Sequence, residues 1–513
     1  MKVLPTIRTR VGPSPTGKAH IGFLRTAIFN YLFAKKHGGE FLLRIEDTDE
    51  KRFDPDAEKY ILDALNWMNI KPDHGPTFGD GRFGPYRQTE RNYRPFVDKL
   101  LKEGHAYYAF DTDDELSALR KAYEGSKKPF SYDKNTRMSM RNSLSMSSSA
   151  VDALLASNAP HTIRFKMPDD PVDVVFTDLV RGTVAFNTSN LDDKVLLKSS
   201  GIPTYHLAVV VDDHAMKITH ALRGEEWLSS TPLHLLLYDA LEWKAPEFGH
   251  LPLLLGSDGK KLSKRRAYKS GTPIFPFTTF VTDEDGSDLG MSDGLCELGY
   301  DPDAMFNYLA LLGWNPKDNR EIMSREELIE AFDLSGVNSA GAMFDVDKAK
   351  HFNKVYLSAR GGKALVNALP DNVFGYSEAN LEKIAMAGLE RTSFAKDIPS
   401  IVGYFFTDVE PPVTDMKYAA EFSILLDDII TFIKSRNSEG IAWDPEITDI
   451  AIVTMLNERG FNRGAMLNNM RLCFTGGPSG PKLHEMMDMM GEAETLRRME
   501  KAKTLLSSLS IAG

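Results

Sequence analysis

Residues 1–100 alternate between two spacings of hydrophobic positions. Short apolar stretches at Ile7–Val11 and Phe41–Ile45 are typical of strands, and Leu24–Leu32 between them carries apolar residues at helical spacing. The pair Gly38-Gly39 ends that helix, and Tyr60–Met68 repeats the helical pattern. Strands that alternate with amphipathic helices predict an α/β domain built on a parallel sheet.

The pattern changes between residues 101 and 204. A charged helical stretch at Asp114–Gly125 is followed by a polar run, Met138–Ser149, which is rich in Ser and Met and which we interpret as a loop without a function. Strand-like segments follow at Thr162–Lys166 and Val172–Phe176. This segment therefore differs in organisation from the one before it.

Strands of the α/β type are predicted again after this segment. The apolar run from Pro203 to Val211 predicts a central parallel strand, because such strands are apolar on both faces. Shorter strands are predicted at Ile218–Leu222 and Leu251–Leu255. A helix is predicted to begin at Gly224–Leu228, where acidic residues meet the positive end of the helix dipole.

From about residue 325 onward the periodicity is mostly helical. Ser324 and Glu327 have the spacing of a capping box at the start of the first helix. The predicted helices are Ser324–Phe332, Leu381–Gly388, Phe422–Arg436, Ile447–Arg459 and Lys482–Ala502. This part of the sequence contains no catalytic motif, and the chain contains no internal repeat.

Three stretches carry candidate chemistry. In Thr9–Gly22 (TRVGPSPTGKAHIG), a strand end with Arg10, a turn stiffened by prolines and a helix opened by His20 suit a phosphate-bearing ligand. Glu46–Asp49 follow a strand, where open α/β sheets bind ligands. The glycine-flanked basic loop Lys260–Arg265 suits a mobile phosphate clamp. The structural alternatives are an ordinary strand–turn–helix corner, a solvated acidic turn and a solvated basic loop.

Together, these stretches resemble the signatures of class I aminoacyl-tRNA synthetases of the glutamyl type. His20-Ile21-Gly22 is similar to the HIGH motif, and Gly12–Gly17 (GPSPTG) is similar to the segment that precedes it in glutamyl enzymes. Lys260–Arg265 (KKLSKR) is similar to the KMSKS loop, and Arg44–Asp49 (RIEDTD) to another glutamyl signature. Two unrelated signatures in the right order are more specific than one, so the chain is identified as a member of this family.

The resemblance implies a Rossmann-like class I catalytic domain with a connective insertion, followed by an all-helical C-terminal anticodon-binding region. The implied parts are the first half of the catalytic domain at 1–100, the insertion that binds the tRNA acceptor end at 101–204, the second catalytic half with the KMSKS-like loop at 205–266, a linker and stem-contact region at 267–340, and the anticodon-binding region at 341–513.

The resemblance also implies the reaction. Glutamate and ATP form glutamyl-adenylate and pyrophosphate, and the glutamyl group then passes to the 2′-hydroxyl of the terminal adenosine of tRNA(Glu). The first step needs alignment and cations rather than proton transfer, because the carboxylate nucleophile is already charged. The sequence indicates no general base for the second step, and it leaves open whether tRNA(Gln) is also charged.

Matching the family motifs residue by residue gives three sets of site residues. The predicted catalytic residues, which donate hydrogen bonds or positive charge to the triphosphate, are His20, Lys261 and Lys264. The predicted glutamate-binding residues are Arg10, Gly12, Ser14, Glu46, Tyr205 and Arg223. The predicted ATP-binding residues are Thr16, His20, Gly22, Glu226, Leu254, Lys261, Ser263 and Lys264.

Glutamate recognition requires compensation of two carboxylates and one ammonium group. The planar forks of Arg10 and Arg223 suit the carboxylates, and Glu46 suits the ammonium group. Arg8 has the same strand parity as Arg10 and is interpreted as structural. Val209 stands where many family members have asparagine, which removes one expected polar contact.

Composition adds limits but does not itself indicate tRNA. A chain of 513 residues suggests three or four units, and 42% hydrophobic with 26% charged residues is ordinary for a soluble globular protein. The net charge of −11 argues mildly against nucleic-acid binding. No apolar run is long enough to span a bilayer, and the start, MKVLPTIRTR, leaves no room for a signal peptide before Arg10. Two distant cysteines, Cys296 and Cys473, favour a reducing cytoplasm.

The expected cofactor is Mg²⁺ carried by ATP as substrate, without a protein metal cage. No structural zinc is predicted, since Ala109 and Asp111 stand where the cysteine-based zinc site of many bacterial relatives would begin. The family suggests a monomer. The alternatives are a glutaminyl-tRNA synthetase, which typically has an acid and an asparagine in the loop at Gly12–Thr16, the short glutamyl-queuosine enzyme, which lacks an anticodon domain, and a non-catalytic tRNA-binding relative.

Overall fold

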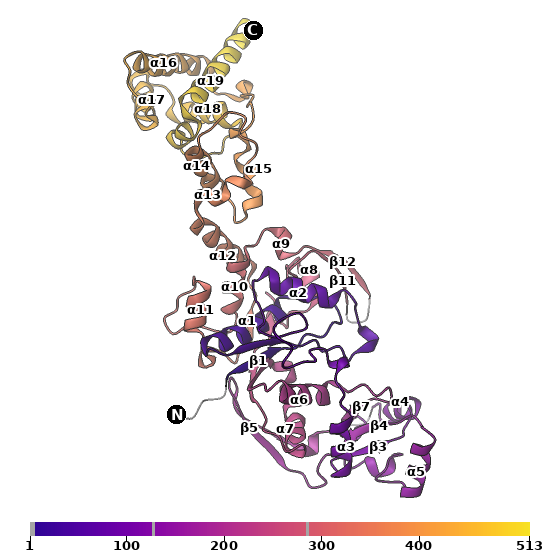
Figure 1. The fold of residues 1–513 in the computed structure, drawn as a ribbon. Helices are drawn as coiled ribbons and strands as arrows, with labels where there is room; N and C mark the ends of the chain where they lie inside the picture. The colour runs from indigo at the N-terminus through magenta and orange to yellow at the C-terminus, as the bar shows by residue number, and fades with distance from the viewer. Residues whose placement is uncertain (1–5, 126–128, 284–286, 513) are drawn as a thin grey trace, which may run out of the picture. The chain divides into compact units, whose positions relative to one another are not determined.

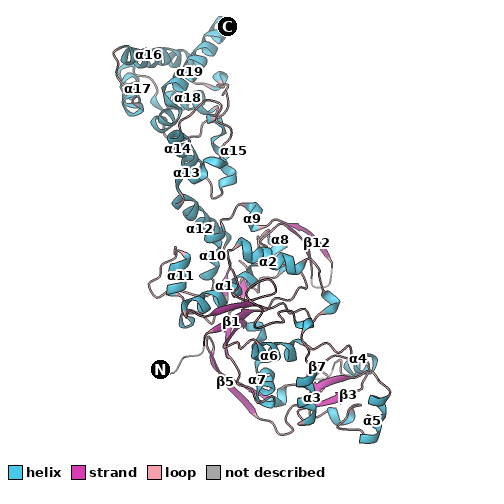
Figure 2. Cartoon of the chain, in the orientation of Figure 1, coloured by secondary structure: helices cyan, strands magenta, loops and turns pink. Residues whose placement is uncertain are grey.

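The computed structural model describes residues 6–125, 129–283 and 287–512. The described chain divides into two compact units (Figure 1). The first unit comprises Met1–Glu297 with Met305–Val346, and the second comprises Leu298–Ala304 with Asp347–Gly513. The first unit mixes strands and helices, whereas helices and loops make up the second (Figure 2).

The centre of the first unit is a parallel sheet, as predicted. Strand β1 (Arg8–Val11) pairs in parallel with β2 (Glu40–Leu43), and β8 (His220–Gly224) pairs in parallel with β9 (Glu247–Leu251). The Thr219 backbone N–H, just before β8, donates to the Arg8 carbonyl at 2.9 Å, so β1 and β8 are neighbours. Strand β5 (Asp173–Asp178) pairs with β9 in parallel and with β6 (Gly182–Asn187) in antiparallel.

Helices α1 (Ile21–Lys36) and α2 (Ala57–Trp67) confirm the first two helices predicted from spacing. Apolar residues of α1 from Ile21 to Ala34 are buried, and α1 contacts β1, β2 and β8. His37 is the C-terminal cap of α1, and Gly38 follows it in the left-handed conformation with φ of 61°. This agrees with the predicted glycine stop. The N-terminus of α1, capped by His20, lies within the stretch Thr9–Gly22 that is predicted to bind a phosphate-bearing ligand.

The predicted central strand at Pro203–Val211 is wrong, because this run forms helix α6 (Tyr205–Ala215). Residues Leu207–Asp213 are all buried, since α6 packs against α7 (Thr231–Ala240). A helix that is buried on every side is apolar on every side, so a short apolar run does not separate it from a buried strand. A 3₁₀ helix at Glu225–Ser230 precedes α7 where one longer helix is predicted.

The predicted strand at Leu251–Leu255 is divided in the structure. Strand β9 ends at Leu251, and β10 (Leu254–Leu255) pairs instead with β13 (Ala342–Met343). The backbone between them crosses Pro252, whose missing N–H group cannot continue a strand ladder. Helix α8 (Lys264–Ser270) contains the last two residues of the predicted basic loop, so only Lys260–Ser263 of that stretch are non-helical. Strands β11 (Thr279–Thr282) and β12 (Asp288–Ser292) form a hairpin.

A small antiparallel sheet lies within residues 101–204. Its strands are β3 (Ala106–Ala109), β4 (Thr162–Phe165) and β7 (Val195–Leu197). Helix α3 (Arg94–Lys102) precedes it, and α4 (Asp113–Ala122) and α5 (Ser148–Ala156) lie between β3 and β4. The end of the Ser-rich run has a structural role, because the Ser147 hydroxyl accepts from the Ala150 N–H at the start of α5.

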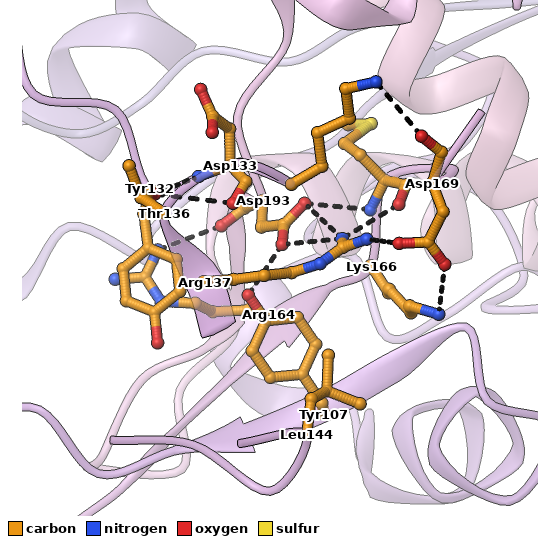
Figure 3. Close-up of polar contacts among 12 residues, drawn as sticks. Tyr107, Tyr132, Asp133, Thr136, Arg137, Leu144, Arg164, Lys166, Asp169 and Asp193 are labelled. Carbon is orange, nitrogen blue, oxygen red and sulfur yellow. Dashed lines mark hydrogen bonds and ion pairs between the residues drawn. The ribbon is translucent and has the colours of Figure 1, made fainter. Parts of the chain in front are cut away.

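A buried polar cluster joins this small sheet to the segment between α4 and α5 (Figure 3). The carboxylate of Asp193 accepts from the Tyr107 hydroxyl at 2.7 Å and from the Met167 N–H at 2.9 Å. The buried guanidinium of Arg137 pairs with Asp193 at 3.1 Å and with the exposed carboxylate of Asp169. The cluster therefore connects three segments of residues 101–204 through one fully buried acid.

Asp111, at a position where the family resemblance implies a zinc-site cysteine, holds the segment between α4 and α5. Asp111 accepts from the Tyr132 hydroxyl and from the Arg141 N–H, both at 2.8 Å. Asn142 in turn donates to the Tyr132 oxygen at 3.1 Å. Among residues 6–125, 129–283 and 287–512, no group of three His, Cys, Asp or Glu side chains is placed to hold a metal ion. The absence of structural zinc stays a prediction.

Helices α9 (Leu295–Leu298), α10 (Pro302–Ala310) and α11 (Arg325–Ala331) follow. The capping box predicted for α11 is confirmed: the Ser324 hydroxyl accepts from the Glu327 N–H, and the Glu327 carboxylate accepts from the Ser324 N–H. Helix α12 (Val346–Ala359) begins at the boundary between the units.

The second unit has its own hydrophobic core, formed mainly by Leu, Ile, Phe and Met side chains. Its helices are α13 (Gly361–Leu365), α14 (Glu378–Leu389), α15 (Ile398–Val402), α16 (Ala419–Ser438), α17 (Pro445–Arg459), α18 (Arg463–Thr475) and α19 (Leu483–Ala512). Gly491, with φ of 72°, interrupts α19, whereas one continuous helix is predicted there. Among the described helices, none combines the length and apolar composition needed to cross a membrane.

Candidate active site

One cavity of about 380 Å³ lies in the first unit, at the carboxyl ends of β1, β8 and β9. All of the predicted site residues line this cavity except Ser263. The predicted residues that line it are Arg10, Gly12, Ser14, Thr16, His20, Gly22, Glu46, Tyr205, Arg223, Glu226, Leu254, Lys261 and Lys264. The cavity thus brings together residues that are more than two hundred positions apart in the sequence, at the sheet edge where α/β folds bind ligands.

His20 caps the N-terminus of α1 and is held in one tautomer. Its Nδ1 accepts from the Gly22 N–H at 2.9 Å, so the ring hydrogen is on Nε2. Burial, Lys264 and Lys261 lower the pKa of His20 to about 4, so the ring is neutral at neutral pH. A Cβ on Gly22 would lie 2.6 Å from the His20 ring, which explains the glycine. His20 is therefore a neutral hydrogen-bond donor at an anion-attracting helix end.

Lys261 and Lys264 differ from the two arginines that follow them, Arg265 and Arg266. Arg265 pairs with Asp283 at 3.0 Å, and Arg266 with Asp258 at 3.5 Å. In the described part of the chain, neither lysine has an ion-pair partner, and both line the cavity. Burial lowers the pKa of Lys264, and Lys18 lowers it further while Asp54 opposes this. Two cations without acidic partners are thus directed to the same space as His20.

Ser263 lies outside the cavity lining and has a structural contact. Its hydroxyl oxygen accepts from the Arg266 N–H at 3.4 Å and caps α8. This cap fixes the backbone between the two lysines. Direct ATP binding by Ser263 stays a prediction.

A buried ionic network underlies the other end of the cavity. Arg10 binds Asp213 with two hydrogen bonds of 3.0 Å, and the fully buried Arg44 binds Asp213 at 2.6 Å and Glu46 at 2.8 Å. Burial alone would raise the pKa of Asp213, but Arg10 and Arg44 hold it below its usual range. Burial raises the pKa of Glu46 although Arg44 opposes this. The positions of Arg10 and Glu46 are therefore fixed through Arg44 and Asp213.

Gly12 is required by the close approach of Glu46. A Cβ at Gly12 would lie 2.2 Å from Glu46 Oε1 and 2.6 Å from its Cδ. The Glu46 N–H also donates to the Pro13 carbonyl at 2.9 Å. The proline-containing loop and the acidic segment after β2 therefore pack as one wall of the cavity.

Arg223 lies in a different environment from Arg10. Its Nε donates to His250 Nε2 at 3.1 Å, and its Nη1 donates to the Tyr205 hydroxyl at 3.1 Å and to His234 Nδ1 at 3.2 Å. Its Nη2 donates to the Thr231 hydroxyl at 2.9 Å and to a backbone carbonyl at 3.3 Å. No acidic side chain of the described residues lies within ion-pair distance of Arg223. Its positive charge is therefore not balanced by direct contact.

Three residues in or beside the cavity were missed in the sequence. Arg44 and Asp213 are charged residues inside apolar segments, and that signal could have indicated a buried ion pair. The buried Arg25 lines the cavity and donates to the Pro252 carbonyl at 2.5 Å, while its Nε and Nη1 have no partner in the described part of the chain. Arg25 lies three residues after Gly22, about one turn along α1, and that spacing could have indicated that it faces the same side of the helix as the HIGH-like motif.

Two residues discussed with the site lie elsewhere. Arg8 pairs with Glu40 at 2.6 Å, outside the cavity lining, which agrees with a structural role. Val209 is buried in the hydrophobic core with Leu233 and Leu237. The position where the resemblance implies an asparagine thus contributes to packing in this chain.

Family models match two parts of the chain. Residues 6–351 match the family of class I tRNA synthetases (E and Q), catalytic domain, and residues 362–503 match an anticodon-binding domain. The chain is 41% identical to a glutamate–tRNA ligase of Parabacteroides distasonis over 98% of this chain and 99% of that protein. It is 42% identical to one of Phocaeicola vulgatus with the same coverage.

A solved structure is similar over almost the whole chain. The crystal structure of a glutamate tRNA ligase from Elizabethkingia meningosepticum in complex with its amino acid has a TM-score of 0.88 and 41% identity, and the match covers 98% of this chain and all of that one. The fold is thus a class I catalytic domain followed by a helical anticodon-binding domain. The chain therefore belongs to the glutamate–tRNA ligase family of class I aminoacyl-tRNA synthetases.

Proposed function

We propose that this chain ligates L-glutamate to tRNA(Glu) in two steps, with ATP as the energy source. The observation that carries the proposal is the division of one cavity into two ends. One end holds the neutral His20 with Lys261 and Lys264, and the other holds Arg10, Glu46 and Arg223. A triphosphate suits the first end, and an amino acid with two carboxylates suits the second.

In the first step, a carboxylate oxygen of glutamate's α-carboxyl group attacks the α-phosphorus of ATP. The bond to the bridging oxygen breaks, and pyrophosphate leaves with the negative charge. His20 Nε2–H donates to phosphate oxygen, and Lys261 and Lys264 neutralise the charge that develops on pyrophosphate. These groups stabilise the transition state more than the substrates, because more negative charge lies on the leaving pyrophosphate there than in ATP.

Mg²⁺ is proposed to accompany ATP through the phosphate oxygens. The described residues form no carboxylate cage near the lysines, and nucleotide-bound Mg²⁺ needs none because phosphates and water supply its ligands. When bound, the ion neutralises phosphate charge. Thr16, Gly22, Glu226, Leu254 and Ser263 are the further proposed ATP contacts.

Glutamate is proposed to bind with its ammonium group toward Glu46 and its carboxylates toward Arg10 and Arg223. Gly12, Ser14 and Tyr205 supply the remaining contacts. In the second step, the glutamyl group passes to the 2′-hydroxyl of the terminal adenosine, and adenylate leaves with its electron pair. No residue of the cavity is assigned as a base for this step.

The tRNA contacts follow the predicted division of the chain. We propose that residues 101–204 bind the acceptor end, residues 267–340 contact the stem, and residues 341–513 bind the anticodon, while 1–100 and 205–266 form the catalytic halves. A monomer in the cytoplasm is proposed. tRNA(Gln) as a second acceptor is the part of the proposal that depends on anticodon contacts.

Charging of purified tRNA(Glu) and tRNA(Gln) with labelled glutamate or glutamine tests the proposal. Glutamate should be esterified to tRNA(Glu), and the same assay decides whether tRNA(Gln) is an acceptor. Esterification of glutamine alone would indicate a glutaminyl enzyme. Binding of tRNA without any charging would indicate a non-catalytic relative.

A further inference from the structure

A chain of hydrogen bonds surrounds Arg223 and ends on a buried acid that the reaction itself does not use. Asp178 Oδ2 lies 2.6 Å from His250 Nδ1, and His250 Nε2 lies 3.1 Å from Arg223 Nε. On the other side, His234 Nδ1 lies 3.2 Å from Arg223 Nη1. Asp178, Arg223, His234 and His250 are all buried.

The hydrogen bonds fix the protonation of both imidazoles. An arginine N–H can only donate, so His250 Nε2 and His234 Nδ1 must both be unprotonated acceptors. The hydrogen of His250 is therefore on Nδ1, where it donates to Asp178. Burial lowers the pKa of His250 and of His234, which agrees with neutral rings.

The acid at the end of the chain is held in one orientation. Asp178 Oδ1 accepts from the N–H groups of Val180 and Arg181 at 3.0 and 2.9 Å, and from the His250 N–H at 3.2 Å. Burial alone would raise the pKa of Asp178, but the His250 hydrogen bond and these backbone N–H groups lower it. Asp178 is therefore an ionised acceptor whose second oxygen is left for His250 alone.

All five N–H groups of Arg223 thus have acceptors before any substrate arrives, and all of those acceptors are uncharged. Arg10, by contrast, binds the Asp213 carboxylate directly. Uncharged acceptors orient the Arg223 guanidinium but do not neutralise its charge. The nearest carboxylate in this chain of hydrogen bonds, that of Asp178, is separated from Arg223 by the His250 ring, so its attraction is weaker than that of a direct ion pair. The Tyr205 hydroxyl, which accepts from Arg223, keeps its own hydrogen to donate toward the cavity.

We propose that Asp178 and His250 are positioning residues for glutamate: they orient Arg223 through a fixed imidazole tautomer and leave its charge available for a substrate carboxylate. The proposal rests on the proposed function, in which Arg223 is a glutamate-binding residue. It adds that the affinity for glutamate depends on an acid that does not line the cavity.

Asp178→Asn tests the tautomer directly. The amide oxygen must face the three backbone N–H groups, which places the amide N–H₂ against His250 Nδ1. Nδ1 must then accept, the ring hydrogen moves to Nε2, and two donors meet at Arg223 Nε. We expect the KM for glutamate to rise about tenfold to a hundredfold, while the KM for ATP changes less than about twofold.

Two substitutions of His250 separate the acceptor from the ring. His250→Gln carries an amide oxygen near the position of Nε2 and can still accept from Arg223, whereas the shorter His250→Asn cannot reach it. Both remove the ring, so a purely structural role predicts similar losses. The proposal predicts that His250→Asn behaves like Asp178→Asn and that His250→Gln recovers most of the glutamate affinity.

Aminoacylation kinetics of the full chain with tRNA present, and the melting temperature of each variant, supply these readouts. Unchanged glutamate KM in Asp178→Asn and His250→Asn, or equal rises in the KM for glutamate and for ATP, would overturn the proposal. Should the variants not fold, ¹⁵N NMR of histidine-labelled wild type decides: an unprotonated His250 Nε2 supports it, and a protonated one refutes it. Wild type that charges no glutamate would refute the proposed function instead, while the tautomer measurement remains independent.

Discussion

The two glycines of the loop between β1 and α1 allow the two ends of the cavity to be perturbed separately. Gly12 lies against Glu46, and Gly17 lies against Lys264. A Cβ at Gly12 would be 2.2 Å from Glu46 Oε1, a distance at which one of the two must move. Glu46 is held by Arg44 at 2.8 Å, so the carboxylate cannot move without weakening a buried ion pair.

The expected size of the effect of Gly12→Ala follows from these contacts. Displacement of Glu46 removes a charge-assisted hydrogen bond to the glutamate ammonium group, which is typically worth ~1.5–3 kcal/mol. At ~1.4 kcal/mol for each factor of ten, the KM for glutamate should rise about tenfold to a hundredfold. The added methyl group should also destabilise the first unit by ~1–3 kcal/mol, because the contact is overpacked.

Gly17→Ala is the matched control on the same loop. Gly17 has φ of 148°, which strains an alanine, and its added Cβ would lie 3.1 Å from Lys264 Nζ. This substitution should raise the KM for ATP or lower kcat, with little change in the KM for glutamate. Aminoacylation measured with each substrate varied in turn gives both constants. If Gly12→Ala changed the KM for ATP as much as that for glutamate, the division of the cavity into two ends would be refuted.

Three further predictions concern the nucleotide end and the insertion. Lys264→Ala should lower the rate of adenylate formation, measured by pyrophosphate exchange, at least about a hundredfold, because the lysine charge acts on the leaving pyrophosphate. The affinity for glutamate should stay within about twofold of the wild-type value. Equal losses in rate and affinity would remove that role. His20 should remain neutral with its hydrogen on Nε2 as the pH falls from 8 to 5, because its pKa is lowered to about 4. Titration of the ring near pH 6.5, observed by ¹⁵N NMR of labelled histidine, would contradict this. Asp193→Asn should destabilise the β3–β4–β7 sheet by ~3–5 kcal/mol, because Arg137 loses its buried partner, and hydrogen exchange in β3 and β4 should become faster. Asp169→Asn, at an exposed carboxylate, is the control and should have little effect.

Local patterns predicted most of the elements around the site. The strand–turn–helix at Thr9–Gly22, the helix stop at Gly38 and the capping box at Ser324 each depend on residues close together in sequence. The apolar run at Tyr205–Val211 could not be assigned in this way, because burial on all sides removes the periodicity that separates a helix from a strand. Its helical state depends on packing against α7, which is a tertiary contact.

The site residues with recognisable motifs were predicted, and their supporting residues were not. His20, Lys261 and Lys264 belong to signatures that a single sequence displays. Arg44 and Asp213 meet only because β2 and α6 are brought together in the fold, and their pairing connects positions 169 residues apart. For Ser263, the motif predicts contact with ATP, whereas in the structure its hydroxyl caps helix α8.

The histidines and the acid around Arg223 also lacked a sequence signal. His234 and His250 lie on α7 and β9, and Asp178 ends β5, so only the sheet order places them around one guanidinium. A lone histidine in an apolar segment is usually a satisfied core residue. Here the satisfied contacts themselves orient a side chain of the cavity.

In the proposed reaction, a single cavity binds glutamate and ATP and joins them. Pyrophosphate exchange into ATP by the purified wild-type chain, with tRNA(Glu) present and glutamate or glutamine supplied in turn, tests it most directly. Exchange should depend on glutamate and should be lost in the Lys261→Ala, Lys264→Ala double variant, which retains glutamate binding. Exchange supported by glutamine but not by glutamate, or exchange that persists without both lysines, would contradict it.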